Sequence, residues 1–349
     1  MKILIITQVL DQKHPNLGFF VRWVLEFARQ MEQVTVICLE EGVHHLPENV
    51  TVYSLGKEKR RSKILYILKF YRAILKARDE YDVVFVHMNP EYVILGSFIW
   101  RLLHKKVGLW YLHKHVGVRL KLATFFTHVI FTASKESFRL SSPKIHIVGH
   151  GIDTDFFPEL TREAKDIFNI VSIGRLTPTK HHEIVIDAVQ SMLSRGVLVT
   201  LTIVGGPGKP EDDAYVKKLE EQVRTAGYEN EIRFAGAVPH ADLPAYLYGS
   251  HVLAHTGDTG SLDKVALEAM ASGLPVVSSN DSIVAMLKAY PGLTFSKGNA
   301  TELAGALEKI RVLTQKERDE IGASLRELVR AEHSLPRLVL KLQNEYNSL

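Results

Sequence analysis

The chain has 349 residues, of which 46% are hydrophobic and 23% are charged, and its formal net charge is +4. This composition predicts a folded chain of two domains, at the usual size of about 150 residues each, and it excludes an intrinsically disordered protein. A single cysteine, Cys38, excludes a disulfide within the chain, and no segment approaches the ~20 consecutive apolar residues of a membrane-spanning helix, so a cytoplasmic protein is expected.

The predicted elements form two series in which short apolar strands alternate with helices. The apolar run in residues 1–7 is read as the first strand, because it is too short for a signal peptide. Strands are expected near 2–7, 34–39, 50–55, 83–88, 107–112, 128–131 and 145–148, then near 170–173, 199–204, 232–235, 252–255, 275–278 and 293–295. Such alternation is typical of parallel sheets covered by helices on both faces. The sequence therefore predicts two Rossmann-like α/β domains, with a last helix near 335–347.

The two halves of the chain differ in charge. Residues 1–160 carry a net charge of +7 and residues 161–349 a net charge of −3. The densest basic patch, at 57–63, leads into a helix with one strongly apolar face, a combination that suits an anionic membrane surface. The alternative is an ordinary outer helix that shows its lysines to solvent. No recognisable motif accompanies the patch, so nucleic-acid binding is not expected.

A first polar motif follows the strand expected at 170–173. Gly174 allows a sharp exit from this strand, and Pro178 suits a helix start because that position needs no N–H group. Arg175 and Lys180 lie in the same turn. An arginine fork, a lysine point charge and the free N–H groups of a helix start all favour phosphate oxygens. We therefore predict a phosphate-binding turn, with two solvated surface charges as the alternative.

A second motif follows the strand expected at 252–255. Apolar residues at helical spacing predict a helix that starts within 262–265 and carries Glu268. Ser261 is then expected as the N-cap, with Asp263 as a first-turn acid that complements the helix dipole. Glu268 supplies a carboxylate that can accept two hydrogen bonds at once. Both motifs are predicted at one edge of the second sheet, which suits a nucleotide diphosphate.

Together the two motifs resemble the GT-B glycosyltransferases of the retaining family 4 (group 1). In that family the C-terminal domain usually reads Gly-Arg-Leu-x-x-x-Lys-Gly and later Glu-x7-Glu-Ala-Met-Ala-x-Gly-x-Pro-Val, and here the second motif reads Glu268-Ala269-Met270-Ala271-Ser272-Gly273-Leu274-Pro275-Val276. The resemblance covers nearly the whole chain. It implies two Rossmann-like domains facing across a cleft. Residues 1–155 would form an acceptor-side domain, with helix 335–349 packing back on it, and residues 156–334 would bind the nucleotide sugar.

The activity implied by the resemblance is retaining transfer of a hexose to a hydroxyl of a glycan or lipid-linked acceptor, as in cell-envelope polysaccharide synthesis. The donor would be a nucleotide-diphosphate sugar, and no metal or other cofactor is implied. Such an enzyme would be cytoplasmic and could lie at the inner membrane face. Two alternatives remain open: a GT-B nucleotide-sugar epimerase, and a catalytically silent nucleotide-sugar-binding subunit.

The resemblance also assigns residues. Arg175 and Lys180 would meet the charge of the leaving diphosphate, Glu268 would bind the ribose hydroxyls, and His113, with His115 as its rival, would lie near the transferred sugar. Further donor contacts are expected from Gly18, Val238, Leu262, Asp263, Lys264 and Val265.

The family's first glutamate, which contacts the transferred sugar, falls on Gly260 in this chain. We therefore expect Asp263 to take over the contact with the sugar, with Asp258, backbone groups or water as the alternatives. Asp153-Thr154-Asp155 spells the Asp-x-Asp with which other glycosyltransferase folds hold a divalent ion, but it lies in the expected hinge. The spacing of the histidines also lacks a metal-ligand pattern. No metal site is predicted.

Overall fold

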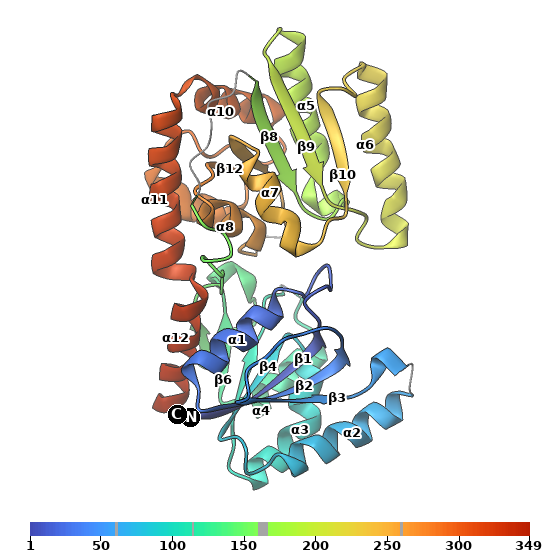
Figure 1. Ribbon diagram of the computed structural model, residues 1–349, viewed down its shortest axis with the longest axis vertical. Helices are drawn as coiled ribbons and strands as arrows, with labels where there is room; N and C mark the ends of the chain where they lie inside the picture. The colour runs from blue at the N-terminus through green and yellow to red at the C-terminus, as the bar shows by residue number, and fades with distance from the viewer. Residues whose placement is uncertain (60–61, 114, 160–166, 259–260) are drawn as a thin grey trace. The chain divides into compact units, whose positions relative to one another are not determined.

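The computed structural model describes residues 1–59, 62–113, 115–159, 167–258 and 261–349. The chain divides into two compact units, one formed by Met1–Gly151 with Leu335–Leu349 and the other by Ile152–Ser334 (Figure 1). Within the described ranges, no helix is long and apolar enough to cross a membrane.

The first unit contains a seven-stranded parallel sheet in the order β3-β2-β1-β4-β5-β6-β7. Its strands are β1 (Lys2–Leu10), β2 (Gln33–Glu41), β3 (Val50–Ser54), β4 (Val83–His87), β5 (Lys106–Trp110), β6 (Val129–Thr132) and β7 (Ile145–Ile147). Its helices and 3-10 turns are α1 (Phe20–Gln30), η1 (Lys57–Lys59), α2 (Lys63–Lys76), α3 (Pro90–Leu102), α4 (Val118–Phe126), η2 (Lys135–Ser137) and α12 (Leu335–Ser348).

Helices cover both faces of this sheet because alternate strand residues point to opposite sides. Ile3 and Ile5 pack in one core with α1 and α12, whereas Leu4 and Ile6 pack in another with α2, α3 and α4 (Figure 1). The last helix is tied to the sheet by the buried Tyr346, whose hydroxyl donates to the Val84 carbonyl at 2.7 Å. Residues far apart in the sequence thus complete one core.

The second unit contains a five-stranded parallel sheet in the order β10-β9-β8-β11-β12. Its strands are β8 (Phe168–Ile173), β9 (Val199–Val204), β10 (Ile232–Gly236), β11 (Val252–His255) and β12 (Val276–Ser278). The strand expected at 293–295 is wrong: Thr294 forms only an isolated bridge with Ser278. Leu293 and Phe295 are buried as in a strand, but left-handed Gly292 and Gly298 confine the extended backbone to this short piece.

The helices and 3-10 turns of the second unit are η3 (Pro178–Lys180), α5 (His182–Ser194), η4 (Pro210–Asp212), α6 (Asp213–Ala226), η5 (His240–Asp242), α7 (Leu243–Tyr248), α8 (Lys264–Ala271), α9 (Asp281–Met286), η6 (Leu287–Ala289), α10 (Ala300–Val312) and α11 (Gln315–His333). Helix α11 packs tightly on the end of α8, since a Cβ at Gly322 would lie only 2.0 Å from the Gly273 carbonyl oxygen. Arg326 of α11 also donates to the carbonyl of Ala271. These contacts fix the C-terminal end of α8.

Candidate functional site at the switch point of the second sheet

The strand order of the second sheet reverses between β8 and β11. In open α/β sheets, ligands bind at such a reversal, outside the carboxyl ends of the strands. The turn after β8 approaches the turn after β9 so closely that a Cβ at Gly205 would lie 1.8 Å from the Gly174 carbonyl oxygen. The Gly174 N–H group donates to Val204 and the Gly205 N–H group to Gly236. The loops that build this edge are therefore held by the backbones of their neighbours.

The turn after β8 exposes the side chain of Arg175, for which the described part of the chain offers no ion-pair or hydrogen-bond partner. The backbone of the neighbouring residue is held in place, because the Leu176 N–H group donates to the Gly206 carbonyl at 2.8 Å. The prediction that a helix begins at Pro178 is wrong. Pro178 opens the 3-10 turn η3, and α5 starts only after His181, whose φ of 51° interrupts the helix. The family motif has glycine here, the residue that adopts this left-handed conformation at least cost.

Lys180 and Asp263 form an ion pair across the strand-order reversal, with side chains only 12% and 15% exposed. The same carboxylate oxygen lies 3.1 Å from Nε2 of His255, whose Nδ1 lies 2.8 Å from the Ser278 hydroxyl. Burial alone would raise the pKa of the Asp263 carboxyl, but the Lys180 ammonium and the His255 ring outweigh it and hold that pKa well below its usual value. Asp263 is therefore a carboxylate that fixes Lys180.

The helix after β11 starts at Lys264, within the expected range of 262–265 but two positions later than an N-cap at Ser261 would place it. Asp263 is the N-cap residue of α8, with extended backbone angles and no side-chain capping bond, so the assignment of Ser261 as N-cap and Asp263 as a first-turn acid is wrong. The side chain of Asp263 turns instead to Lys180 and His255. Leu262 is buried and Val265 partly buried. The first N–H groups of α8 lack acceptors within the helix, so this end carries partial positive charge.

Glu268 lies in the second turn of α8 and is only 3% exposed. Its Oε1 atom lies 2.8 Å from Nε2 of His240 and 3.6 Å from the ammonium of Lys264. The His240 ring stacks on Phe156 with 5.5 Å between ring centres. The described residues offer no hydrogen bond to the other oxygen of Glu268, Oε2, which leaves it for a ligand hydroxyl.

His240 was missed by the sequence interpretation, which selected Val238 for a backbone contact. The available signal was that His240 follows Val238 by two residues; in the structure it opens the 3-10 turn η5.

A second residue missed from the sequence is His182, the first residue of α5. It is 2% exposed, its Nδ1 lies 3.1 Å from the Ser172 hydroxyl, and its Nε2 is buried without a hydrogen-bond partner in the described structure. Burial, reinforced by the charge of Lys180, lowers the pKa of His182 to about 4. The ring is therefore neutral near pH 7. Its Nε2 would lie 3.7 Å from a Cβ built on Gly174, at the base of the turn that carries Arg175.

Two predicted site residues, Gly18 and His113, belong to the first unit. Gly18 has a local structural reason, because a Cβ there would lie 2.7 Å from the Gln12 carbonyl oxygen and 2.8 Å from that of His14. His113 is exposed and its ring meets Tyr111 edge-on at 5.7 Å. Their predicted roles toward the donor stay predictions.

The remaining acidic candidates have other partners. Asp258 forms an ion pair of 2.7 Å with Lys297. The carboxylate of Asp153 accepts the N–H groups of Asp155 and Phe156 at 3.2 Å each, as a turn-forming residue does. Within the described ranges, no group of three His, Cys, Asp or Glu side chains is arranged to hold a metal ion. Gly260 lies outside the described residues.

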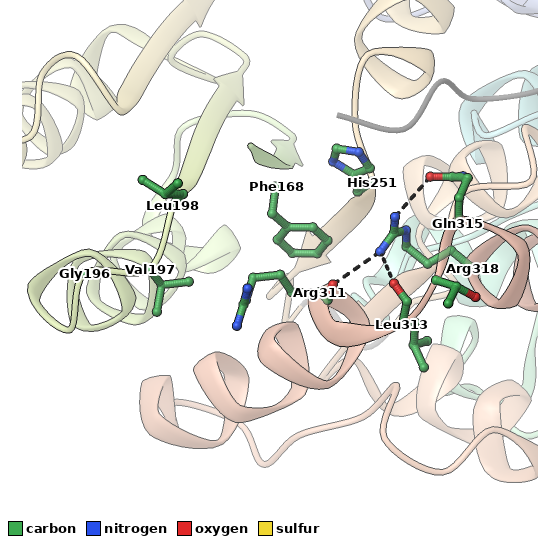
Figure 2. Close-up of a pocket in the computed structure, with 10 residues that line it drawn as sticks. Phe168, Gly196, Val197, Leu198, His251, Arg311, Leu313, Gln315 and Arg318 are labelled. Carbon is green, nitrogen blue, oxygen red and sulfur yellow. Dashed lines mark hydrogen bonds between the residues drawn. The ribbon is translucent and has the colours of Figure 1, made fainter. Parts of the chain in front are cut away.

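A separate pocket of about 450 Å³ lies at the opposite, amino end of β8 (Figure 2). Arg318 points into this region, but its guanidinium is occupied by the carbonyls of Arg311 at 3.3 Å and Leu313 at 2.6 Å and by the Gln315 side chain at 3.1 Å. These bonds cap the end of α10. We therefore place the candidate site at the carboxyl edge.

Comparison with known families assigns the chain to a class of enzymes. The family model described as Glycosyl transferases group 1 matches residues 153–327, and the model described as Glycosyl transferase 4-like matches residues 13–110. The chain belongs to the group 1 glycosyltransferases.

Characterised relatives match over part of their length. Mannosylfructose-phosphate synthase of Agrobacterium fabrum is 29% identical over 153 residues, which are 41% of this chain and 34% of the relative. D-inositol 3-phosphate glycosyltransferase of Jonesia denitrificans is 30% identical over 172 residues, which are 44% of this chain and 38% of the relative. The chain thus spans little more than a third of the length of these two proteins.

Solved structures match over the whole chain. HepE of Anabaena in complex with UDP superposes with a TM-score of 0.77 at 20% identity and covers 100% of both chains. A glycosyltransferase from Rickettsia africae superposes with a TM-score of 0.74 at 16% identity, covering 99% of this chain and 98% of that one. The expected GT-B fold of two Rossmann-like α/β domains is confirmed.

Proposed function

We propose that the chain is a retaining glycosyltransferase that moves a sugar from a nucleotide-diphosphate donor to a hydroxyl of a glycan or lipid-linked acceptor. The observation that carries this proposal is the set of charges at the switch point of the second sheet. Exposed Arg175, the anchored ammonium of Lys180 and the N-terminal end of α8 belong to loops at the same sheet edge. The membership in the group 1 family supports the same reaction class.

The chemistry of the leaving group explains why cations gather there. When the sugar departs, negative charge grows on the diphosphate, and fixed positive groups lower the barrier in proportion to how well they are positioned beforehand. Lys180 is held in place by Asp263, and Arg175 offers a fork of donors that matches two phosphate oxygens. No nucleophilic residue is assigned to the reaction.

We assign the nucleoside to the second turn of α8. Glu268 keeps Oε2 for the ribose hydroxyls, while His240 and Lys264 hold Oε1. The backbone beside Val238 would contact the base. HepE of Anabaena has been solved with UDP, with UDP and glucose, and with UDP-glucose, which makes uridine donors the first to test.

A thermal-shift screen of UDP, GDP, ADP and dTDP with their sugars tests the donor proposal. We expect one nucleotide to raise the melting temperature, because a ligand at 100 times its Kd stabilises the native state by about 2.7 kcal/mol. The same shift should shrink in Glu268→Gln, which halves the accepting capacity for two hydroxyls. If no nucleotide shifts the melting temperature at millimolar concentration, the proposal is wrong.

Product analysis separates the two alternatives. An epimerase would convert the nucleotide sugar without an acceptor, and a silent binding subunit would bind the nucleotide without any turnover. Among the described residues, Oε2 of Glu268 and the Arg175 side chain have no partner, and this fits binding in all three cases. The transferred product is therefore the deciding measurement.

Metal independence is a further expected result. We propose that Arg175, Lys180 and the end of α8 meet the diphosphate charge without a divalent ion. Transfer should therefore be unchanged after exhaustive treatment with EDTA. Loss of activity on chelation, with recovery on addition of Mn²⁺ or Mg²⁺, would contradict this and make Asp153 and Asp155 the first residues to test.

A further inference from the structure

A cavity of about 500 Å³ lies in the first unit, between α2 and α3. Its volume falls within the range of about 300–1,000 Å³ that is typical of small-ligand sites. Most of its wall is apolar and comes from Leu39, Tyr66, Ile67, Phe70, Tyr92 and Leu95. Burial raises the pKa of the Tyr92 phenol to about 12, so this hydroxyl stays uncharged. None of these residues takes part in the donor site described above.

The cavity also reaches the switch point of the first sheet, where the strand order reverses between β1 and β4. Gln8 of β1 and Asn89, which follows β4, both line it. The Gln8 amide donates to the Asn89 side chain at 2.6 Å, and the Asn89 amide donates to the His87 carbonyl at 2.7 Å. Ligands sit at this edge in open α/β sheets. The side of the cavity formed by Gln8 and Asn89 therefore lies at the sheet edge where the polar part of a ligand would bind.

Two lysines form another border of the cavity. Lys57 pairs with Glu40 at 2.9 Å, whereas Lys63 has no ion-pair partner among the described residues. The one carboxylate in the wall, Glu91, is paired with Arg119 at 3.0 Å. Helix α2 carries four basic residues and no acidic one. The border therefore favours an anion.

The outer surface of α2 continues the apolar character of the cavity. Ile67 lines the cavity and is itself 39% exposed, and Ile64 and Leu68 are 71% and 60% exposed. An apolar path thus leads from the cavity to the surface of the helix. A buried glycan would need hydrogen-bond partners for its hydroxyls, which this wall does not supply in number. Hydrocarbon fits the wall better.

We propose that this cavity binds the hydrocarbon chain of a lipid-linked acceptor, with the phosphate that joins chain and sugar placed against Lys63 and Lys57. The inference rests on the proposed function and narrows its acceptor from a glycan or lipid-linked molecule to a phosphate-linked amphiphile. Burial of the hydrocarbon chain is driven by removal of apolar surface from water. The two lysines set the direction in which the amphiphile lies, because they bind its phosphate.

The test titrates farnesyl phosphate and dodecyl phosphate as monomers, with dodecanol as the uncharged control, by isothermal titration calorimetry. Ile67→Asp places a charge in the cavity wall and should weaken binding of the phosphate amphiphile at least about tenfold. Leu75→Asp is the matched control, because it makes the same change at a 44% exposed residue two turns further along α2, outside the cavity. Both side chains are exposed enough for the fold to tolerate the change, which melting temperatures will check.

A second pair of variants tests the anion border. Lys63→Glu should weaken phosphate amphiphiles about tenfold or more and leave dodecanol unchanged, because a hydrogen bond to a charged group is lost. An acid at the first position of a helix complements its dipole, so α2 is not destabilised. Arg72→Glu makes the same charge change on α2 outside the cavity and should leave binding within twofold.

Tighter binding of farnesyl phosphate would indicate an isoprenoid acceptor, and tighter binding of dodecyl phosphate an acyl-chain acceptor; either supports the inference. Absence of saturable binding, equal losses in the control variants, or binding only to vesicles of anionic lipid would overturn it. The thermal shift by nucleotide is measured on the same variants and should be unchanged. A failed nucleotide shift with intact amphiphile binding would count against the proposed function alone.

Discussion

Arg175→Ala is expected to lower kcat for sugar transfer by ~10²–10³ while leaving the melting temperature unchanged. Arg175 is exposed and has no partner in the described part of the chain, so its removal breaks no contact that stabilises the fold. In the proposed reaction its charge meets the negative charge that grows on the departing diphosphate. Such a surface substitution typically changes the free energy of unfolding by no more than about 0.5 kcal/mol. Steady-state kinetics with the donor from the nucleotide screen, together with thermal melts, measures both quantities.

Two further variants sharpen this experiment. Arg175→Lys keeps the charge but loses the planar fork, and we expect its kcat to lie between those of wild type and Arg175→Ala. Arg311→Ala removes an exposed arginine at the opposite end of the same sheet and should leave kcat unchanged (Figure 2). Near-normal turnover in Arg175→Ala would place the diphosphate elsewhere.

Most of the fold could be predicted from the sequence because strands and helices differ in their hydrophobic period. The strands at 199–204 and 252–255 were predicted with the bounds that the structure shows. The predictions were wrong where the local sequence pattern indicated a strand or a helix start but a left-handed residue nearby ended or delayed the element. Leu293 and Phe295 alternate like strand residues, but the backbone there is bounded by two left-handed glycines. Pro178 signals a helix start, but left-handed His181 delays it.

For the candidate site, the sequence predicted which residues lie at the edge of the sheet. The sequence placed Arg175 and Lys180 in one turn and Glu268 on a helix, because both motifs follow predicted strands. It could not predict which side chains pair. Lys180 meets Asp263 from 83 positions away, and His240 meets Glu268 from 28 positions away. Such contacts depend on loop geometry, which leaves no periodic pattern in the sequence.

The second large expected effect is a loss of folding stability when the ion pair between Lys180 and Asp263 is broken. Asp263→Asn should lower the free energy of unfolding by about 3–5 kcal/mol, because it leaves a largely buried ammonium without its counter-charge. Lys180→Met should have a similar effect by leaving the carboxylate unpaired except for His255. The double variant should lose clearly less than the sum of the two, because each single change removes the same interaction. Urea unfolding of the four proteins measures this coupling.

The contribution of the same ion pair to the free energy of unfolding should depend on pH in the acid range. The folded state holds the pKa of the Asp263 carboxyl below its usual value, so below about pH 4 the unfolded chain takes up a proton that the folded chain does not. The stabilisation is therefore fully present above about pH 5 and is lost as pH falls toward the folded pKa. Asp263→Asn removes this contribution. Its free energy of unfolding should fall less steeply with acid than that of wild type, and parallel curves would contradict the assignment.

Nucleotide binding decides how Asp263 serves the reaction. Because the carboxylate holds Lys180 rather than standing free, we expect Asp263→Asn to weaken nucleotide diphosphate and nucleotide sugar by the same factor and to lower transfer tenfold or more. Calorimetric titration of both ligands measures the two factors. A loss confined to the nucleotide sugar would show instead that Asp263 contacts the sugar, as the sequence predicts. In that case the contact with His255 would be the one that positions the Asp263 carboxylate.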